Sequence, residues 1–210
     1  MMVDVLGISG SPRVGQTTDQ LIYNILRASH CQHEFISLAN KKILSCSSCL
    51  KCKNDNICKI SDDWKPITEH ILAAKVIVLG APNYFGRMNA LTHVFLERFY
   101  SFQHMGKMIV KGKYGVIAAV AGDNPEAVEK DIKSFFEEIG IIHIGTVKAF
   151  GDSNCYSCKY ATKCRSGEIL KKYGLKISAD KVMIPCIEKQ PEVLEKVREI
   201  GKIIHEAINV

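Results

Sequence analysis

Short apolar runs alternate with amphipathic segments along the first two thirds of the chain. Five runs have the length and composition of buried strands, and they span residues 3–8, 35–38, 76–80, 116–120 and 141–147. Between the runs, apolar residues recur at the three- and four-residue spacing of helices, as in Leu21, Ile22, Ile25 and Leu26. Because parallel strands need helical crossovers, the alternation predicts an α/β fold with a doubly wound parallel sheet.

Capping residues locate three helices between the runs. Asp62 or Asp63 can cap the first, Asn89 the second, and Pro125 marks the start of the third. The apolar faces expected for these helices are Trp64, Ile67, Ile71 and Leu72, then Leu91, Val94, Phe95, Phe99 and Phe102, and finally Val128, Ile132, Phe135, Phe136 and Ile139.

The end of the chain differs from the alternating part. Residues 151–210 hold a group of cysteines, a polar stretch and an amphipathic helix that starts at Pro191. We therefore expect residues 1–150, including a cysteine-rich loop at 46–58, to form the sheet domain. Residues 151–210 are predicted to be a helical extension that docks on this domain.

The composition indicates a cytoplasmic protein with reduced thiols. The 210 residues include nine cysteines, and a chain of this length buries enough surface to fold without disulfides. No apolar run approaches the ~18 residues of a membrane span, and the N-terminus has no secretory signal pattern, so we expect no membrane partner. The 28 basic and 22 acidic side chains are scattered, which argues against a nucleic-acid partner.

The loop after the first run has the composition of a phosphate site. Residues 9–18 (SGSPRVGQTT) supply hydroxyls, a guanidinium, two glycines and the start of a helix. Gln16 stands where a nucleoside-triphosphatase loop needs lysine, and the GxGxxG dinucleotide motif is missing. A single terminal phosphate fits this loop best. The alternative is a solvated turn capped by Thr17 or Thr18.

The loop after the third run offers a surface for a ring system. Tyr84 and Phe85 present flat apolar faces, and Gly86 permits close backbone approach. The alternative is that both aromatic side chains plug the end of the core. Gly122, after the fourth run, is expected at the same edge of the sheet.

Four cysteines after the second run have spacing typical of an iron-sulfur site. Cys46, Cys49, Cys52 and Cys58 form C-x2-C-x2-C-x5-C. Zinc more commonly binds two C-x2-C pairs separated by a longer loop. Because this loop follows a parallel strand, we expect it on the same side of the sheet as the phosphate loop.

A second group, Cys155, Cys158 and Cys164, with Cys186 as a distant fourth, could bind zinc, bind a second cluster, provide redox-active thiols or remain unligated. We favour unligated thiols because no fourth ligand is specified locally. Cys31 is expected in the core, and the histidines show no metal spacing.

Two of these segments resemble one family. Residues 7–13 (GISGSPR) and 82–86 (PNYFG) are similar to the GxSGSPR and P-x-Y-F-G motifs of the NADPH-dependent FMN reductase and iron-sulfur flavoprotein superfamily. The resemblance implies a flavodoxin-like sheet of five parallel strands in the order 2-1-3-4-5. It also implies an FMN site whose residues are Ser9, Ser11, Pro12, Arg13, Gln16, Thr17, Thr18, Pro82, Asn83, Tyr84, Phe85, Gly86 and Gly122.

The cysteine loop in turn resembles the compact motif that holds a 4Fe-4S cluster in iron-sulfur flavoproteins. The implied function is electron transfer through FMN and a cluster on Cys46, Cys49, Cys52 and Cys58, with ferredoxin or NAD(P)H as redox partner. The resemblance also implies a homodimer or homotetramer, and no catalytic acid or base is expected. Two alternatives are an NAD(P)H-dependent FMN or quinone reductase without a cluster, and a zinc-binding module without enzymatic activity.

Overall fold

The computed structural model describes residues 3–158, 160, 163–174 and 184–209. Its sheet has five parallel strands, which are β1 (Val5–Ser9), β2 (His33–Ser37), β3 (Val76–Tyr84), β5 (Tyr114–Ala121) and β6 (Ile142–Phe150). Their order across the sheet is β2-β1-β3-β5-β6, and a short strand β4 (Arg87–Met88) pairs antiparallel with β3. Counted along the chain, the parallel strands have the order 2-1-3-4-5, so the predicted flavodoxin-like sheet is confirmed.

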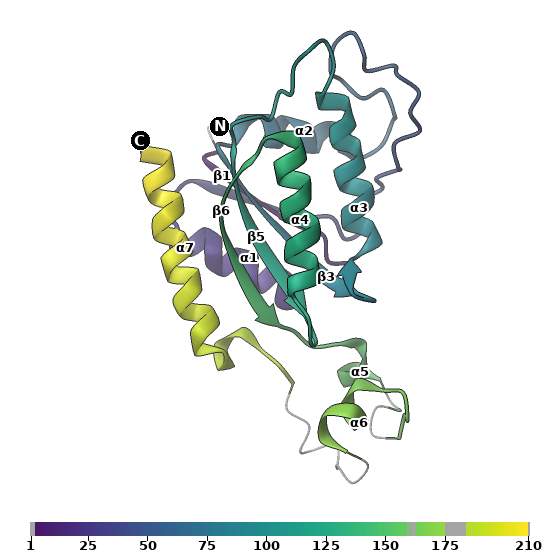
Figure 1. Ribbon diagram of the computed structural model, residues 1–210, viewed down its shortest axis with the longest axis vertical. Coiled ribbons are helices and arrows are strands. Elements are labelled where there is room, and N and C mark those ends of the chain that lie inside the picture. The colour runs from purple at the N-terminus through teal and green to yellow at the C-terminus, as the bar shows by residue number, and fades with distance from the viewer. Residues whose placement is uncertain (1–2, 159, 161–162, 175–183, 210) are drawn as a thin grey trace.

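Helices cover both faces of the sheet (Figure 1). One face packs against α1 (Thr17–Ala28) and α7 (Pro191–Asn209), and the other against α2 (Trp64–Ala73), α3 (Ala90–Glu97) and α4 (Glu126–Ile139). Strand residues alternate between the two cores, so that Leu6 and Ile8 face α2 to α4 whereas Val5 faces α1 and α7. Burial on both faces explains why the strands are continuous apolar runs.

Two expected helix faces differ from the structure. The helix after Asn89 ends at Glu97, and the chain continues as a 3-10 helix, η1 (Arg98–Phe102). Residues three apart eclipse in a 3-10 helix, which points Phe99 and Phe102 together toward Trp64, with ring centroids 5.4 and 5.6 Å from it. Leu72 is 42% exposed because it lies beyond the buried stripe of α2.

The capping side chains also serve tertiary contacts. Asp62, rather than the adjacent Asp63, accepts a hydrogen bond from the Trp64 N–H at 3.1 Å. Asn89 precedes α3 without a side-chain capping bond, and its Nδ2 donates instead to the carbonyl of Gly10 at 2.7 Å. This bond ties the start of α3 to the loop after β1.

The C-terminal part begins at the carboxyl end of β6. Two short helices, α5 (Asn154–Ser157) and α6 (Glu168–Tyr173), lie beyond that edge of the sheet in Figure 1. A 3-10 helix, η3 (Ile187–Lys189), then leads into α7, which confirms the predicted helix from Pro191. Gln190, between η3 and α7, ties this segment to the end of β6. Its Oε1 accepts from the Phe150 N–H at 2.9 Å, and its Nε2 donates to the Phe150 carbonyl at 2.7 Å. Within the described residues, no helix has the length and apolar character needed to cross a membrane.

We expect Gly201→Ala to destabilise the fold through the contact between α1 and α7. A Cβ at position 201 would lie 2.3 Å from the carbonyl oxygen of Ala28, a backbone atom that cannot rotate away. Separating the helices should cost ~1–3 kcal/mol, more than the better helix propensity of alanine returns. Urea unfolding measures the loss, and the exposed neighbour change Lys202→Ala should stay within about 0.5 kcal/mol of wild type. An unchanged or raised unfolding midpoint for Gly201→Ala would contradict this packing.

Candidate functional site

A cleft of about 470 Å³ opens at the carboxyl ends of the parallel strands. It is lined by the last residues of β3 and β5 and by residues that follow β1, β3, β5 and β6, which meet at this edge as expected for a doubly wound sheet. The predicted cofactor-binding residues that line it are Ser11, Arg13, Gln16, Thr17, Thr18, Pro82, Asn83, Tyr84, Phe85 and Gly122.

Three residues of the predicted set do not line this cleft. Ser9 is buried beneath the first loop, where its Oγ accepts a hydrogen bond from the Ser11 N–H at 3.3 Å. Pro12 is exposed on the loop. Gly86 lines an adjoining hollow that shares Asn83 with the main cleft.

The first loop leads into α1 in a form suited to an anion. Gly15 takes a positive φ of 71°, and its N–H donates to Asp19 at 2.7 Å. Gln16 occupies the position before α1 without a side-chain capping bond. The first-turn N–H groups of α1 are therefore not covered by their capping residue, and the hydroxyls of Thr17 and Thr18 lie beside them.

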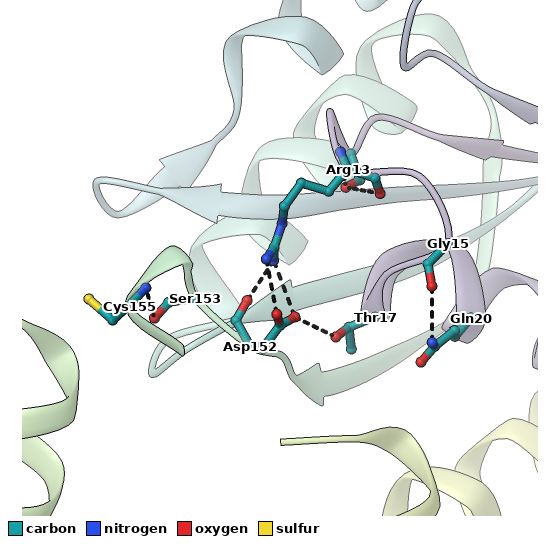
Figure 2. A network of polar contacts seen from close by, with 8 residues as sticks. Arg13, Gly15, Thr17, Gln20, Asp152, Ser153 and Cys155 are labelled. Atoms are coloured by element: carbon teal, nitrogen blue, oxygen red, sulfur yellow. Dashed lines mark hydrogen bonds and ion pairs between the residues drawn. The ribbon is translucent and has the colours of Figure 1, made fainter. Parts of the chain in front are cut away.

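Arg13 has a partner that the sequence did not reveal. Its guanidinium reaches across the cleft to Asp152, just after β6 (Figure 2). Nη1 lies 3.0 Å from Oδ2, and Nη2 donates to the Asp152 carbonyl at 2.6 Å and to Oδ1 at 3.3 Å. The Thr17 hydroxyl lies 3.4 Å from the same carboxylate. Asp152 thus fixes the position of Arg13 and offsets its charge. The only sequence signal for this contact is that Asp152 follows the last strand at the same edge.

The aromatic residues belong to the hairpin that joins β3 to β4. Tyr84 and Phe85 are both exposed, so they do not plug the core. Phe85 and Gly86 both have positive φ, at 55° and 75°, as a tight two-residue turn requires. Asn83 braces the turn by accepting from the Gly86 N–H at 2.9 Å and donating to the Asn124 carbonyl at 2.6 Å. The hairpin therefore presents aromatic surface beside the cleft.

The C-terminal extension supplies part of the cleft wall, which the sequence interpretation missed. Ser153, Asn154 and Cys155 line the cleft together with Glu168 from α6. A Cβ on Gly122 would lie 2.8 Å from a carboxylate oxygen of Glu168, so the absence of a side chain there lets α6 close over the loop after β5.

The cysteine-rich loop takes a path away from this cleft. The cleft lining contains none of Cys46, Cys49, Cys52 and Cys58, and the loop runs on the outer side of α3 (Figure 1). Instead, Cys52 lies 3.1 Å from His104 Nε2, and Cys58 accepts a hydrogen bond from Arg98 Nη2 at 3.1 Å. The loop starts at the same edge of the sheet as the phosphate loop, because β2 is parallel to β1, but its four thiols do not line the cleft of this chain. The loop spans more than twenty residues, so the position of β2 fixes its start but not its course.

The donor set and the loop backbone are compatible with a thiolate-ligated cluster. Within the described ranges, no three His, Cys, Asp or Glu side chains form a preassembled metal site. The four thiols nevertheless belong to one short stretch of the loop, residues 46–58. Burial raises the pKa of the Cys52 thiol, and the charges of Cys58, Cys49 and Cys46 raise it further. Each interval between successive cysteines contains one residue with positive φ, namely Ser48, Leu50 and Asn56. Such backbone is costly in non-glycine residues and suits a loop that wraps around a bound group.

The remaining cysteines are dispersed. Cys155 lines the cleft, Cys158 is exposed, and Cys164 lies 3.5 Å from the Ser166 hydroxyl, which holds the pKa of the Cys164 thiol below its ordinary value. Cys186 is half-buried before η3. Cys31 is half-buried against the α1 and α7 core, and its thiol lies 3.7 Å from His205 Nδ1.

Comparisons with known proteins place this chain among flavin-dependent redox proteins. A family model described as NADPH-dependent FMN reductase matches residues 3–154. An iron-sulfur flavoprotein of Methanocaldococcus jannaschii is 34% identical over 146 residues, which cover 67% of this chain and 75% of that protein. An iron-sulfur flavoprotein of Methanosarcina thermophila is 28% identical over 153 residues, 70% of this chain and 80% of the relative. Among solved structures, the Trp repressor binding protein of Bacillus subtilis shares the fold, with a TM-score of 0.59, 19% identity and coverage of 94% of this chain and 98% of that one.

Proposed function

The chain belongs to the NADPH-dependent FMN reductase family and is therefore a flavin-dependent oxidoreductase, and from this premise we propose that it carries both FMN and a 4Fe-4S cluster and transfers electrons between redox partners. The observation that carries the proposal is the presence in one chain of a cleft at the carboxyl edge of the sheet and a loop with four closely spaced cysteines, Cys46, Cys49, Cys52 and Cys58. The family implies FMN, and the names of the relatives suggest the cluster.

In the proposed complex, the FMN phosphate lies at the start of α1. The hydroxyls of Ser11, Thr17 and Thr18 and the uncovered N–H groups of α1 would bind its oxygens, and Arg13 would face it from its place on Asp152. Tyr84, Phe85 and the hairpin backbone would contact the ring, with Gly122 near its pyrimidine end. When bound, FMN supplies a carrier that exchanges electrons in pairs or singly, and the cluster supplies a one-electron carrier.

The proposed cluster ligands are Cys46, Cys49, Cys52 and Cys58. Because these thiols do not line the cleft of their own chain, electron transfer to FMN fits an assembly in which the cysteine loop of one subunit approaches the cleft of another. A homodimer or homotetramer is therefore part of the proposal. Reduced ferredoxin is the proposed donor, beside the reduced pyridine nucleotide that the family implies.

Cofactor analysis of protein purified without oxygen tests the proposal. We expect about one FMN and about four irons with matching acid-labile sulfide per chain, with flavin absorbance bands over a broad iron-sulfur shoulder. Fewer than about two irons per chain would contradict the cluster. Stoichiometric zinc without flavin would favour a metal-stabilised binding module instead.

A second candidate is an NAD(P)H-dependent FMN or quinone reductase without a cluster. It is favoured by the match of residues 3–154 to the family model described as NADPH-dependent FMN reductase. Anaerobic stopped-flow mixing with NADH, NADPH and reduced ferredoxin separates the two. Rapid flavin reduction by a pyridine nucleotide in iron-free protein supports this second candidate, whereas reduction by ferredoxin that requires iron supports the first.

A further inference from the structure

A buried ion pair lies at the neck of the cysteine loop, which is where residues 42–44 and 62–63, on either side of the four cysteines, come together. Arg98, at the start of η1, pairs with Asp62, just before α2, and both side chains are fully buried. The guanidinium carbon also lies 5.4 Å from the ring centroid of Trp64. Burying two charges is costly unless their positions are fixed and their hydrogen bonds are made. The hydrogen bonds of this pair connect it to both ends of the cysteine loop.

The pair holds the two ends of the loop together. Asp62 accepts from the Leu44 N–H at 2.9 Å and from the Trp64 N–H at 3.1 Å, while Arg98 Nη1 donates to the Leu44 carbonyl at 2.9 Å. Beside these contacts, the Lys42 N–H donates to the Asp63 carboxylate at 2.6 Å. All four proposed ligands lie between the two ends, so the pair sets the base from which they project.

The other edge of the same guanidinium faces a proposed ligand. Nη2 donates to Cys58 Sγ at 3.1 Å and lies 3.3 Å from Asp62 Oδ1. Arg98 thus stands between a carboxylate and a thiol sulfur, with its positive charge directed at the sulfur. A neutral thiol is a weak acceptor for such a donor, whereas a thiolate that ligates iron makes the bond charge-assisted.

We infer that Arg98 is a positioning residue for the iron-sulfur site, holding the neck of the cysteine loop and raising the reduction potential of the cluster through its hydrogen bond to Cys58. The inference rests on the proposed function, since it requires a cluster on Cys58. Hydrogen bonds to ligand sulfurs and nearby positive charge stabilise the reduced, more negative form of a cluster. Asp62 has the opposite influence, because its carboxylate offsets the charge of Arg98.

The test compares Arg98→Lys and Asp62→Asn with wild type in redox titrations of the cluster followed by electron paramagnetic resonance. A single ammonium cannot reach Leu44, Asp62 and Cys58 together, so Arg98→Lys should lower the cluster potential. A tenfold change in the one-electron reduction equilibrium, about 59 mV, is the size expected. Asp62→Asn should raise the potential, because it leaves the charge of Arg98 without compensation. The FMN potential serves as an internal reference, since neither residue lines the cleft, and Arg27→Lys, on the exposed end of α1, is the matched control.

Opposite shifts of the cluster potential at a constant FMN potential support the inference, because a general loss of packing would not move the two variants in opposite directions. If Arg98→Lys loses iron but retains FMN and helical content, the result supports the part of the inference in which Arg98 holds the ends of the cysteine loop. An unchanged cluster potential in a cluster-loaded Arg98→Lys variant overturns the inference. If Arg98→Lys fails to fold, a cluster potential that is not raised in Asp62→Asn overturns it instead. Iron-free wild-type protein would overturn the proposed function itself, and this inference with it, whereas iron-loaded wild type with unshifted variants overturns this inference alone.

Discussion

Arg13→Ala is expected to weaken FMN binding about 100-fold, equivalent to ~2.7 kcal/mol. Two effects add in this variant. The phosphate loses a charge-assisted donor, an interaction worth about 1.5–3 kcal/mol. In addition, the Asp152 carboxylate, 11% exposed and now without its partner, would stand beside the phosphate and repel it. Fluorescence titration of apoprotein with FMN gives the dissociation constant directly.

The double variant Arg13→Ala/Asp152→Asn separates these effects. Removing the unpaired carboxylate should restore roughly tenfold of the lost affinity, since only the missing donor then remains. Arg27→Ala is the matched control, because this exposed arginine lies at the far end of α1. FMN affinity that is unchanged in Arg13→Ala would place the phosphate elsewhere. An equal loss in the single and double variants would show that Asp152 does not act on the phosphate.

The parallel sheet and the edge at which the cleft lies were predictable because both depend on local patterns, whereas the strand order was implied by the resemblance to a family. Runs such as 76–80 are buried on both faces whatever their neighbours, and parallel strands bring their following loops to one edge. Ser11, Thr17 and Tyr84 therefore could be assigned to one cleft without coordinates. Ser9 ends β1, and its side chain turns beneath the loop, where it accepts from the Ser11 N–H.

The contacts of the extension were not predictable in the same way. Asp152 and Glu168 are single acidic residues without a periodic or spaced pattern, and their place in the cleft depends on how the chain folds back after β6. The ion pair of Asp62 and Arg98 joins residues 36 positions apart in sequence. The cysteine motif predicts which thiols would ligate one group, but it does not predict the path that the loop takes. Spacing within a motif thus predicts ligand chemistry, whereas the surroundings of those ligands depend on tertiary structure.

The repeated spacing of the cysteines provides the control for a last prediction. Cys49, Cys52 and Cys58 have the same C-x2-C-x5-C spacing as Cys155, Cys158 and Cys164. Only the first group has a fourth cysteine nearby in the sequence, and among the described residues only this group has a sulfur that accepts from a buried arginine. Changing the middle cysteine of each group therefore compares two chemically equal substitutions in two different surroundings.

Cys52→Ser is expected to reduce the iron content from about four to less than about one per chain, because it removes the buried one of the four thiolates that would hold the cluster. FMN content should stay at about one per chain, since the cleft contains no residue of this loop. Cys158→Ser should leave both contents unchanged, as its exposed thiol belongs to the group predicted to be unligated. Iron and acid-labile sulfide assays on anaerobically purified protein make the comparison. Iron that persists in Cys52→Ser would move the cluster to other ligands, and iron that falls in Cys158→Ser would show that the thiols next to the cleft hold metal after all.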